Sequence, residues 1–266
     1  MLAERGSSIR RVELLNRGIS PGQISKAVAQ GSIVRVARGH YALPGATARD
    51  VFLARHQATL TCLSVAAELG LWCLVEPGKP HVAVAHGRAV PGCVVHKMSG
   101  RPTLRDVLKH CVRCGTELEA LIVLESAVVQ HKCSINTLRE LFAGRKESAG
   151  RAIVAMIDPQ SMAITETAAR YHLRNAGYNV QGQAHLKDVG HMDLLVDGIL
   201  AVETDGEKYH NTASGWAEDL RRDSMYVRNG VWRLRVPASL VLYHPETLLS
   251  WVRQALAAIR SAPGSH

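Results

Sequence analysis

The stretch of sequence that decides the fold is His191-Met-Asp-Leu-Leu-Val-Asp-Gly-Ile-Leu-Ala-Val-Glu-Thr-Asp205. Apolar runs lie on both sides of an Asp-Gly pair, and this pattern predicts two strands joined by a tight hairpin turn. Across the turn Asp193 can lie beside Glu203, and Asp205 follows Glu203 by two residues on the same face of its strand. Because carboxylates are disfavoured in strands and costly to bury without a partner, these acids need a physical explanation.

A divalent cation is one such explanation. Two or three converging carboxylates repel one another unless a cation joins them. Mg²⁺ or Mn²⁺ takes oxygen ligands, and such an ion can position and activate a water molecule against a phosphodiester. The alternative is that Asp205 and the glycine after it form an ordinary turn and that Glu203 is a solvated side chain.

The segments around the hairpin predict a small α/β domain. Capping residues, stop glycines and apolar periodicity indicate a leading helix, three strands, a charged helix, a fourth strand and a closing helix. The expected order is therefore α-β-β-β-α-β-α. The expected elements are helix 165–177, strands 178–186, 191–196 and 199–205, helix 213–229, strand 231–236 and helix 245–259.

These residues resemble a family of nucleases. Glu166 on the leading helix, Asp193 in His-Met-Asp-Leu-Leu-Val and Glu203 in Val-Glu-Thr-Asp-Gly-Glu-Lys-Tyr-His resemble motifs of the very-short-patch-repair-like endonucleases. They resemble still more closely the uncharacterised domain related to those enzymes, over roughly residues 160–258. The resemblance implies a PD-(D/E)XK restriction-endonuclease-like α/β/α core that cleaves DNA with Mg²⁺. It also implies that Asp193 and Glu203 are the metal ligands and that Glu166 supports them from the helix.

One position departs from the family pattern. Asp205 stands where the general pattern has lysine, so Lys208, His210 or Arg222 is left to stabilise the developing charge. The resemblance gives His210 the role of a general base or of a group that steadies the leaving oxygen. A hydrogen-bonded loop histidine is the alternative for His210, and a salt bridge on the helix surface is the alternative for Arg222. Lys208 and Arg222 are also the DNA contacts expected from this domain.

The N-terminal segment predicts a winged helix-turn-helix. Residues 7–18 have helical apolar spacing, Ser20-Pro-Gly-Gln23 is typical of the start of a second helix, and a basic hairpin follows at residues 33–43. In this arrangement the second helix lies in the major groove and the hairpin forms a wing that meets phosphates or the minor groove. The expected DNA contacts are Gln23 and Lys26 on the helix and Arg35 and Arg38 on the wing.

Residues 8–45 resemble the N-terminal winged-helix domain of AbiEi-type antitoxins. The most specific part is the wing, Gly-x-Ile-x-Arg-Val-x-Arg-Gly-x-Tyr-x-Leu-Pro, which ends at Pro44. In that family the segment is a DNA-binding repressor module. The resemblance implies DNA as a partner and leaves room for a cognate toxin and for a homodimer.

Charge supports a polyanionic partner. The formal net charge is +9, and residues 1–49 hold 8 Lys or Arg against 2 Asp or Glu, whereas residues 161–266 hold 11 against 11. Positive charge at the N-terminal end attracts nucleic acid. A generally basic, arginine-rich protein is the alternative. Neither a membrane-spanning segment nor a signal peptide is expected, and this predicts a cytoplasmic protein.

The middle region, residues 50–160, is harder to interpret. It predicts one or two helices over 52–71, further helices at 104–109, 117–130 and 135–141, strands at 81–84 and 93–96, and a polar linker at Gly144–Arg151. Cys111-Val-Arg-Cys114 has the spacing of half a zinc site, but it lies inside a helical pattern and has no second pair of matching spacing. We therefore expect six reduced cysteines and no structural zinc.

The sequence thus predicts a mixed α/β protein of three domains. These are a winged helix-turn-helix at 1–48, an α+β middle region at 49–150 and a nuclease-like domain at 151–266. The expected function is a DNA endonuclease or nickase, since buried carboxylates cost stability and a scaffold would not need them. The alternatives are an AbiEi-like transcriptional regulator or antitoxin with an inert nuclease fold, and a factor that recognises damaged or mismatched DNA.

Overall fold

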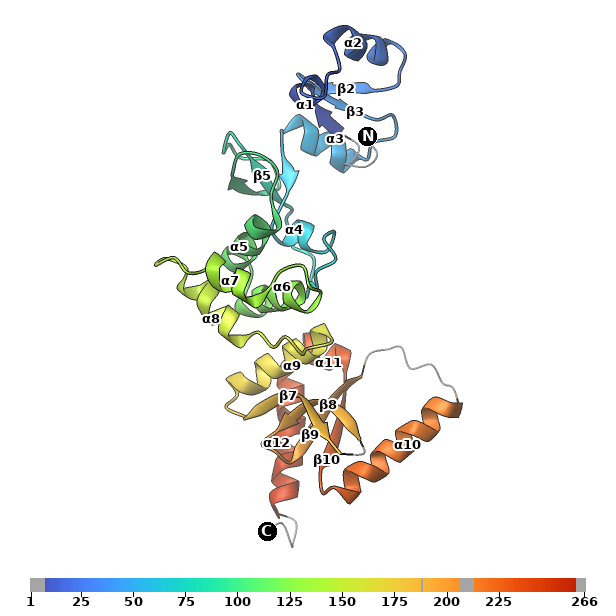
Figure 1. Cartoon of the computed structure of the whole chain (residues 1–266), viewed down its shortest axis with the longest axis vertical. Coiled ribbons are helices and arrows are strands. Elements are labelled where there is room, and N and C mark those ends of the chain that lie inside the picture. The colour runs from blue at the N-terminus through green and yellow to red at the C-terminus, as the bar shows by residue number, and fades with distance from the viewer. Residues whose placement is uncertain (1–7, 188, 206–212, 262–266) are drawn as a thin grey trace. The chain divides into compact units, whose positions relative to one another are not determined.

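The computed structural model describes residues 8–187, 189–205 and 213–261, with the backbone alone for residues 205 and 213–219 (Figure 1). Contacts between residues divide the chain into two units. The first unit holds the residues up to 69 and residues 76–110, and the second holds residues 70–75 and those from 111 onward. The finer division predicted from the sequence, with boundaries after residues 48 and 150, stays a prediction.

The first unit begins with an arrangement compatible with a winged helix. Its elements are β1 (Ser8–Arg10), α1 (Arg11–Leu15), α2 (Pro21–Ala29), β2 (Val34–Ala37) and β3 (His40–Ala42). Strand β3 is the middle strand and is antiparallel to both β1 and β2. Helix α2 begins at a capping box, in which the Ser20 hydroxyl accepts the Gln23 N–H and the Gln23 side chain accepts the Ser20 N–H. The helix start predicted at Ser20 is therefore confirmed.

The prediction of one helix over residues 7–18 is wrong at its beginning. Residues 8–10 form β1, because they pair along β3 with Ile9 opposite Tyr41, and α1 starts only at residue 11. A helix and a strand compete for such a short apolar segment, and here the strand is selected by a partner distant in sequence. Ile9 and Tyr41 then join Leu14, Ile24 and Ile33 in one small core.

A second small sheet follows in the first unit. Its elements are α3 (Ala48–Arg55), β4 (Thr59–Leu60), α4 (Leu63–Ala66), β5 (His81–Val84), β6 (Val94–Lys97) and the start of α5 (Leu104–Cys114). Strand β5 is central, antiparallel to β4 and parallel to β6. Of the one or two helices predicted over 52–71, the structure has two, α3 and α4, and the strand β4 between them was not predicted. The core here is small, and its buried members are Leu60, Val82, Val84 and Val90.

The second unit begins with helices. They are α6 (Glu117–Val129), α7 (Ile135–Leu141), α8 (Ser148–Met156) and α9 (Ile164–Asn175). Helix α6 is buried on all sides over residues 120–128. The linker predicted at Gly144–Arg151 is wrong in its second half, because α8 begins at residue 148. Gly150 is buried in α8 with the Phe142 ring where a Cβ atom would lie, so glycine is needed here for close packing and not for flexibility.

A four-stranded sheet completes the second unit. Its elements are β7 (Val180–Leu186), β8 (Gly190–Val196), β9 (Leu200–Asp205), α10 (Ala213–Arg228), β10 (Trp232–Pro237), α11 (Ala238–Tyr243) and α12 (Pro245–Ser261). The strand order is β10-β9-β8-β7, with β10 parallel to β9 and the other pairs antiparallel. Asp197 and Gly198 have φ values of 50° and 75°, as a type I′ turn requires. The predicted hairpin is confirmed, whereas α11 was not predicted.

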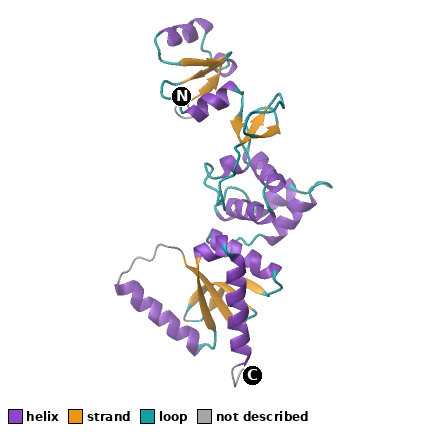
Figure 2. Ribbon diagram, turned by 180° about the vertical axis from the view of Figure 1, so that it is seen from behind, coloured by secondary structure: helices purple, strands orange, loops and turns teal. Residues whose placement is uncertain are grey.

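Helices cover both faces of this sheet, which lies between α10 and α12 in Figure 2. One face carries Leu194 and Val202 and packs against α9, α11 and α12 in the larger core. The opposite face carries Ala201 and packs against Tyr226 of α10. The sheet is therefore a buried layer, and a carboxylate on it lies close to helix side chains.

Candidate functional site

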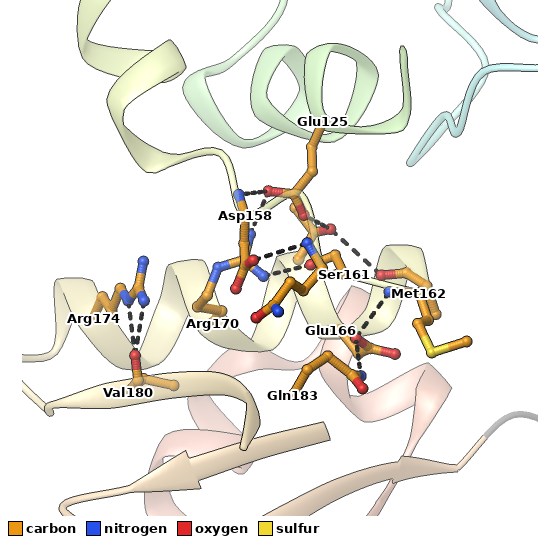
Figure 3. Close-up of polar contacts among 12 residues, drawn as sticks. Glu125, Asp158, Ser161, Met162, Glu166, Arg170, Arg174, Val180 and Gln183 are labelled. Atoms are coloured by element: carbon orange, nitrogen blue, oxygen red, sulfur yellow. Dashed lines mark hydrogen bonds and ion pairs between the residues drawn. The ribbon is translucent and has the colours of Figure 1, made fainter. Parts of the chain in front are cut away.

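Glu166 lies in the first turn of α9 and is buried, with 5% of its surface exposed. Its Oε2 accepts the Met162 N–H at 3.0 Å and the Gln183 side-chain N–H at 2.9 Å (Figure 3). The pKa of Glu166 is raised to about 7, mainly by burial and to a smaller extent by the charge of Asp193, against the effect of these donors. Glu166 is thus a carboxyl group that can hold or release a proton near neutral pH.

Asp193 is half-buried on β8 and bonds to the neighbouring strand. Its Oδ2 accepts the backbone N–H of Thr204 at 2.8 Å and the Thr204 hydroxyl at 3.2 Å. The Thr204 hydroxyl also lies 2.9 Å from that of Thr165 on α9. These contacts join β8, β9 and the start of α9 at the level where Glu166 lies.

Glu203 lies on β9 and is buried, with several partners from other elements. Its Oε1 accepts the Tyr226 hydroxyl at 2.5 Å, and Arg222 and Arg233 each approach the carboxylate to 3.7 Å. Burial raises the pKa of Glu203 and Asp193 adds to the rise, while Tyr226 and the two arginines oppose it. The Glu203 carboxylate is therefore held by protein donors on the α10 side of the sheet.

Asp193 raises the pKa of both Glu166 and Glu203, so it lies within electrostatic reach of each. The effect of Asp193 on Glu166 exceeds that of the cation Arg170. Carboxylates that repel one another provide the oxygen ligands that Mg²⁺ takes. Among the described residues, however, these three carboxylates do not form a group with all ligand atoms within 4.8 Å of one another.

Three predicted residues fall partly or wholly outside the described residues. The backbone of Asp205 pairs with Pro237 across β9 and β10, but its side chain is not among the described ones. Lys208 and His210 lie outside the described residues altogether. Their proposed roles at the site stay predictions.

Arg222 is placed beside Glu203. It is half-buried on α10, donates to the His191 carbonyl at 3.2 Å and lies 3.7 Å from the Glu203 carboxylate. These contacts place a cation next to Glu203, as a role in charge stabilisation would require. Its predicted contact with DNA stays a prediction.

Sequence reasoning missed two residues that hold Glu203, namely Tyr226 and Arg233. Arg233 pairs with both Glu203 and Asp223 and has only 8% of its side chain exposed. An arginine inside the short apolar strand at residues 231–236 was the available signal. A buried arginine needs a carboxylate partner, and the adjacent parallel strand carries one.

A second missed feature is a buried polar network that joins α6 to α9 (Figure 3). The Glu125 side chain is fully buried and accepts the Arg170 guanidinium, the Thr167 hydroxyl at 2.5 Å and the Asp158 N–H at 2.7 Å. Arg170 also donates to the Ser161 hydroxyl at 2.6 Å. The network fixes the helix whose first turn carries the buried acid of the candidate site.

The predicted DNA contacts in the first unit are exposed. Lys26 on α2 and Arg35 and Arg38 on the β2–β3 hairpin all face solvent. Gln23 is exposed too, but its side-chain oxygen accepts the Ser20 N–H at 2.8 Å. Gln23 therefore also caps the start of α2, in addition to its predicted contact with DNA.

Residues 1–44 match the protein family described as "Transcriptional regulator, AbiEi antitoxin". This match supports an AbiEi-type domain at the N-terminal end, and residues 45–266 lie outside it. No curated protein and no solved structure matches the chain. In the described part of the chain, no helix is both long enough and apolar enough to cross a bilayer.

Proposed function

We propose that this protein is a DNA-binding transcriptional regulator of the AbiEi antitoxin type, which docks on DNA through its first 45 residues. The observation that carries the proposal is the family match over residues 1–44. Helix α2 and the hairpin after it support it, because they expose Lys26, Arg35 and Arg38. In a winged helix these are the elements that meet the major groove and the phosphates.

The charge distribution supports the same proposal. Residues 1–49 carry 8 basic residues against 2 acidic ones, and contacts to phosphates release counterions from DNA. Binding then weakens steeply as salt rises. The family description includes the word antitoxin, so a cognate toxin is the protein partner that the proposal implies.

Removing the wing arginines should weaken DNA binding and its salt dependence together. We expect the double variant Arg35→Ala/Arg38→Ala to bind about 10-fold or more weakly and to lower the salt slope by about 2, since each arginine would neutralise about one phosphate. The measurement is fluorescence anisotropy of the full chain on duplex from its own promoter region, over a range of salt concentrations.

The matched control is Arg49→Ala. Arg49 is an exposed arginine of the same unit that already pairs with Glu68 at 3.2 Å, so its loss should leave the slope unchanged. Equal losses in the control and the wing variant would contradict docking through the wing. Absence of binding to any duplex at low salt would contradict the proposal as a whole.

Cleavage of DNA is a second candidate function, favoured by one observation. Asp193 on β8 is electrostatically coupled to Glu166 on α9 and to Glu203 on β9. Asp193 and Glu203 would hold Mg²⁺, and Glu166 would support them. When bound, the ion would polarise a phosphate of the DNA and activate a water molecule. The chain's own contribution is to fix the carboxylates, through Thr204 for Asp193 and through Tyr226 for Glu203.

A supercoiled-plasmid nicking assay tests this candidate. With Mg²⁺ or Mn²⁺ we expect nicking by the natural chain and its loss in Asp193→Ala, because one carboxylate of a shared ion site is removed. Asp197→Asn is the matched control, since Asp197 lies on the same hairpin and pairs with Arg260 at 2.8 Å. Metal-dependent nicking that survives in Asp193→Ala would contradict this candidate, and so would a natural chain that does not nick the plasmid. Transcriptional regulation would then remain as the proposed function.

A further inference from the structure

A cluster of cysteine and histidine side chains lies in the first unit, apart from the carboxylates. Cys62 precedes α4, His81 begins β5 and His96 lies on β6. Their ligand atoms all lie within 4.8 Å of one another. The three residues come from separate segments of the chain, so the fold and not the sequence spacing brings them together.

The two histidines are spaced as ligands of one ion would be. The Nδ1 atom of His81 lies 3.2 Å from the Nε2 atom of His96. Two nitrogens bound to one tetrahedral zinc ion at about 2.0–2.1 Å lie about 3.3 Å apart. The His110 ring stacks on His96 with centroids 4.1 Å apart, and its Nδ1 lies 3.2 Å from the Thr61 hydroxyl. The stacked His110 ring therefore helps to fix the orientation of the His96 ring.

The backbone at Cys62 gives an independent indication of function. Its φ is 56° and its ψ is −143°, a conformation that glycine adopts freely and that other residues adopt only under strain. The residue is also completely buried. A strained, buried cysteine at this position indicates that the thiol, and not the backbone shape alone, is needed there.

Cysteine thiolates and histidine imidazoles are the ligands that zinc prefers in proteins, and three protein ligands can hold the ion. We propose that Cys62, His81 and His96 bind a zinc ion that stabilises the first unit.

The size of the local core explains why an ion would be useful here. The sheet β4-β5-β6 has strands of two, four and four residues and a core of only four buried side chains. Small cores of this kind are commonly stabilised by a metal or by disulfides. None of the six cysteines, all in the described part of the chain, is in a disulfide. Zinc would tie together the segments that this core holds only weakly.

Metal analysis of the full chain tests the proposal. The natural chain, purified under reducing conditions without chelator, should contain about one zinc per chain by elemental mass spectrometry. After exchange into Co²⁺ it should show the visible bands of tetrahedral cobalt and a thiolate-to-cobalt charge-transfer band. We expect Cys62→Ser and His81→Gln to lose the metal, and Cys62→Ser to lose the charge-transfer band.

Cysteines outside the cluster give the matched controls. Cys93→Ser, in the first unit, and Cys133→Ser, in the second, should keep the zinc content and the cobalt spectrum of the natural chain. If Cys62→Ser is insoluble, cobalt titration of the natural chain decides by itself. A natural chain that contains no zinc and gives no tetrahedral cobalt spectrum would overturn the proposal. So would a Cys62→Ser chain that binds both metals as the controls do.

Discussion

Replacing Glu125 by leucine is expected to lower the free energy of unfolding of the second unit by about 3–5 kcal/mol. The Arg170 side chain is 2% exposed, and the Glu125 carboxylate is its acidic partner in the structure. Leucine nearly matches glutamate in volume, so the loss comes from an uncompensated buried charge and not from a cavity. The Asp158 N–H loses its acceptor as well, and the Thr167 hydroxyl keeps only the Ala163 carbonyl at 3.4 Å.

Tryptophan fluorescence during urea unfolding measures this effect in the full chain. The four tryptophans all belong to the second unit, so the signal reports that unit alone; they are Trp72, Trp216, Trp232 and Trp251. Glu117→Leu is the matched control on the same helix. Glu117 is exposed and accepts the Tyr171 hydroxyl at 3.1 Å, and its loss should change the stability by about 0–1 kcal/mol.

A second substitution separates the charge from other causes. Adding Arg170→Met to Glu125→Leu should recover part of the lost stability, because an apolar pair of similar volume replaces an isolated buried cation. If the double variant is less stable than Glu125→Leu, or if Glu125→Leu unfolds like the Glu117→Leu control, the buried ion pair does not hold α6 to α9 in the way the structure indicates.

The sequence predicted the elements that local chemistry decides. The hairpin at Asp197 follows from a residue pair that tolerates positive φ, and the start of α2 follows from the capping residue Ser20. Helix 135–141 and strand 81–84 were predicted at their observed bounds. Each of these depends on residues within a few positions of one another.

Elements decided by distant partners were missed. Residues 8–10 form a strand only because β3, about 30 residues later, offers an edge for pairing. Glu125 interrupts an apolar run in sequence, whereas in the fold it is the buried partner of an arginine 45 residues away. No local pattern contains that information.

The same limit applies to the two sites. Strand alternation and the Asp-Gly turn were enough to place Asp193 and Glu203 near each other, but not to find Tyr226 and Arg233, which come from later elements. The Cys-x-x-Cys pair lies in a helical pattern and has no second pair of matching spacing, and this argued against zinc. A ligand set assembled from three segments has no fixed spacing, so a spacing rule could not detect the cluster around Cys62.

The stability of the second unit should also depend on pH through Glu166. Its pKa is about 7 in the folded chain, against an ordinary value of 4.5. Between these two values the folded state binds more protons than the unfolded state, so stability falls as pH rises. The stabilising contribution is present in full below pH 4.5 and is lost as pH rises to about 7. A rise of this size corresponds to about 3 kcal/mol.

Glu166→Gln removes the titrating group and keeps an acceptor for the Met162 N–H, which the carboxylate binds at 3.0 Å. In urea unfolding followed by tryptophan fluorescence, without divalent cations, the stability of the variant relative to the natural chain should increase by about 3 kcal/mol between pH 4.5 and pH 8.

Glu140→Gln, on the exposed side of α7, controls for the loss of one negative charge. A difference that stays constant over this range would show that Glu166 does not titrate near neutral pH. If Glu166 and Asp193 also share a divalent ion, adding Mg²⁺ at pH 8 should stabilise the natural chain more than the variant, because the ion offsets the repulsion that amidation has already removed.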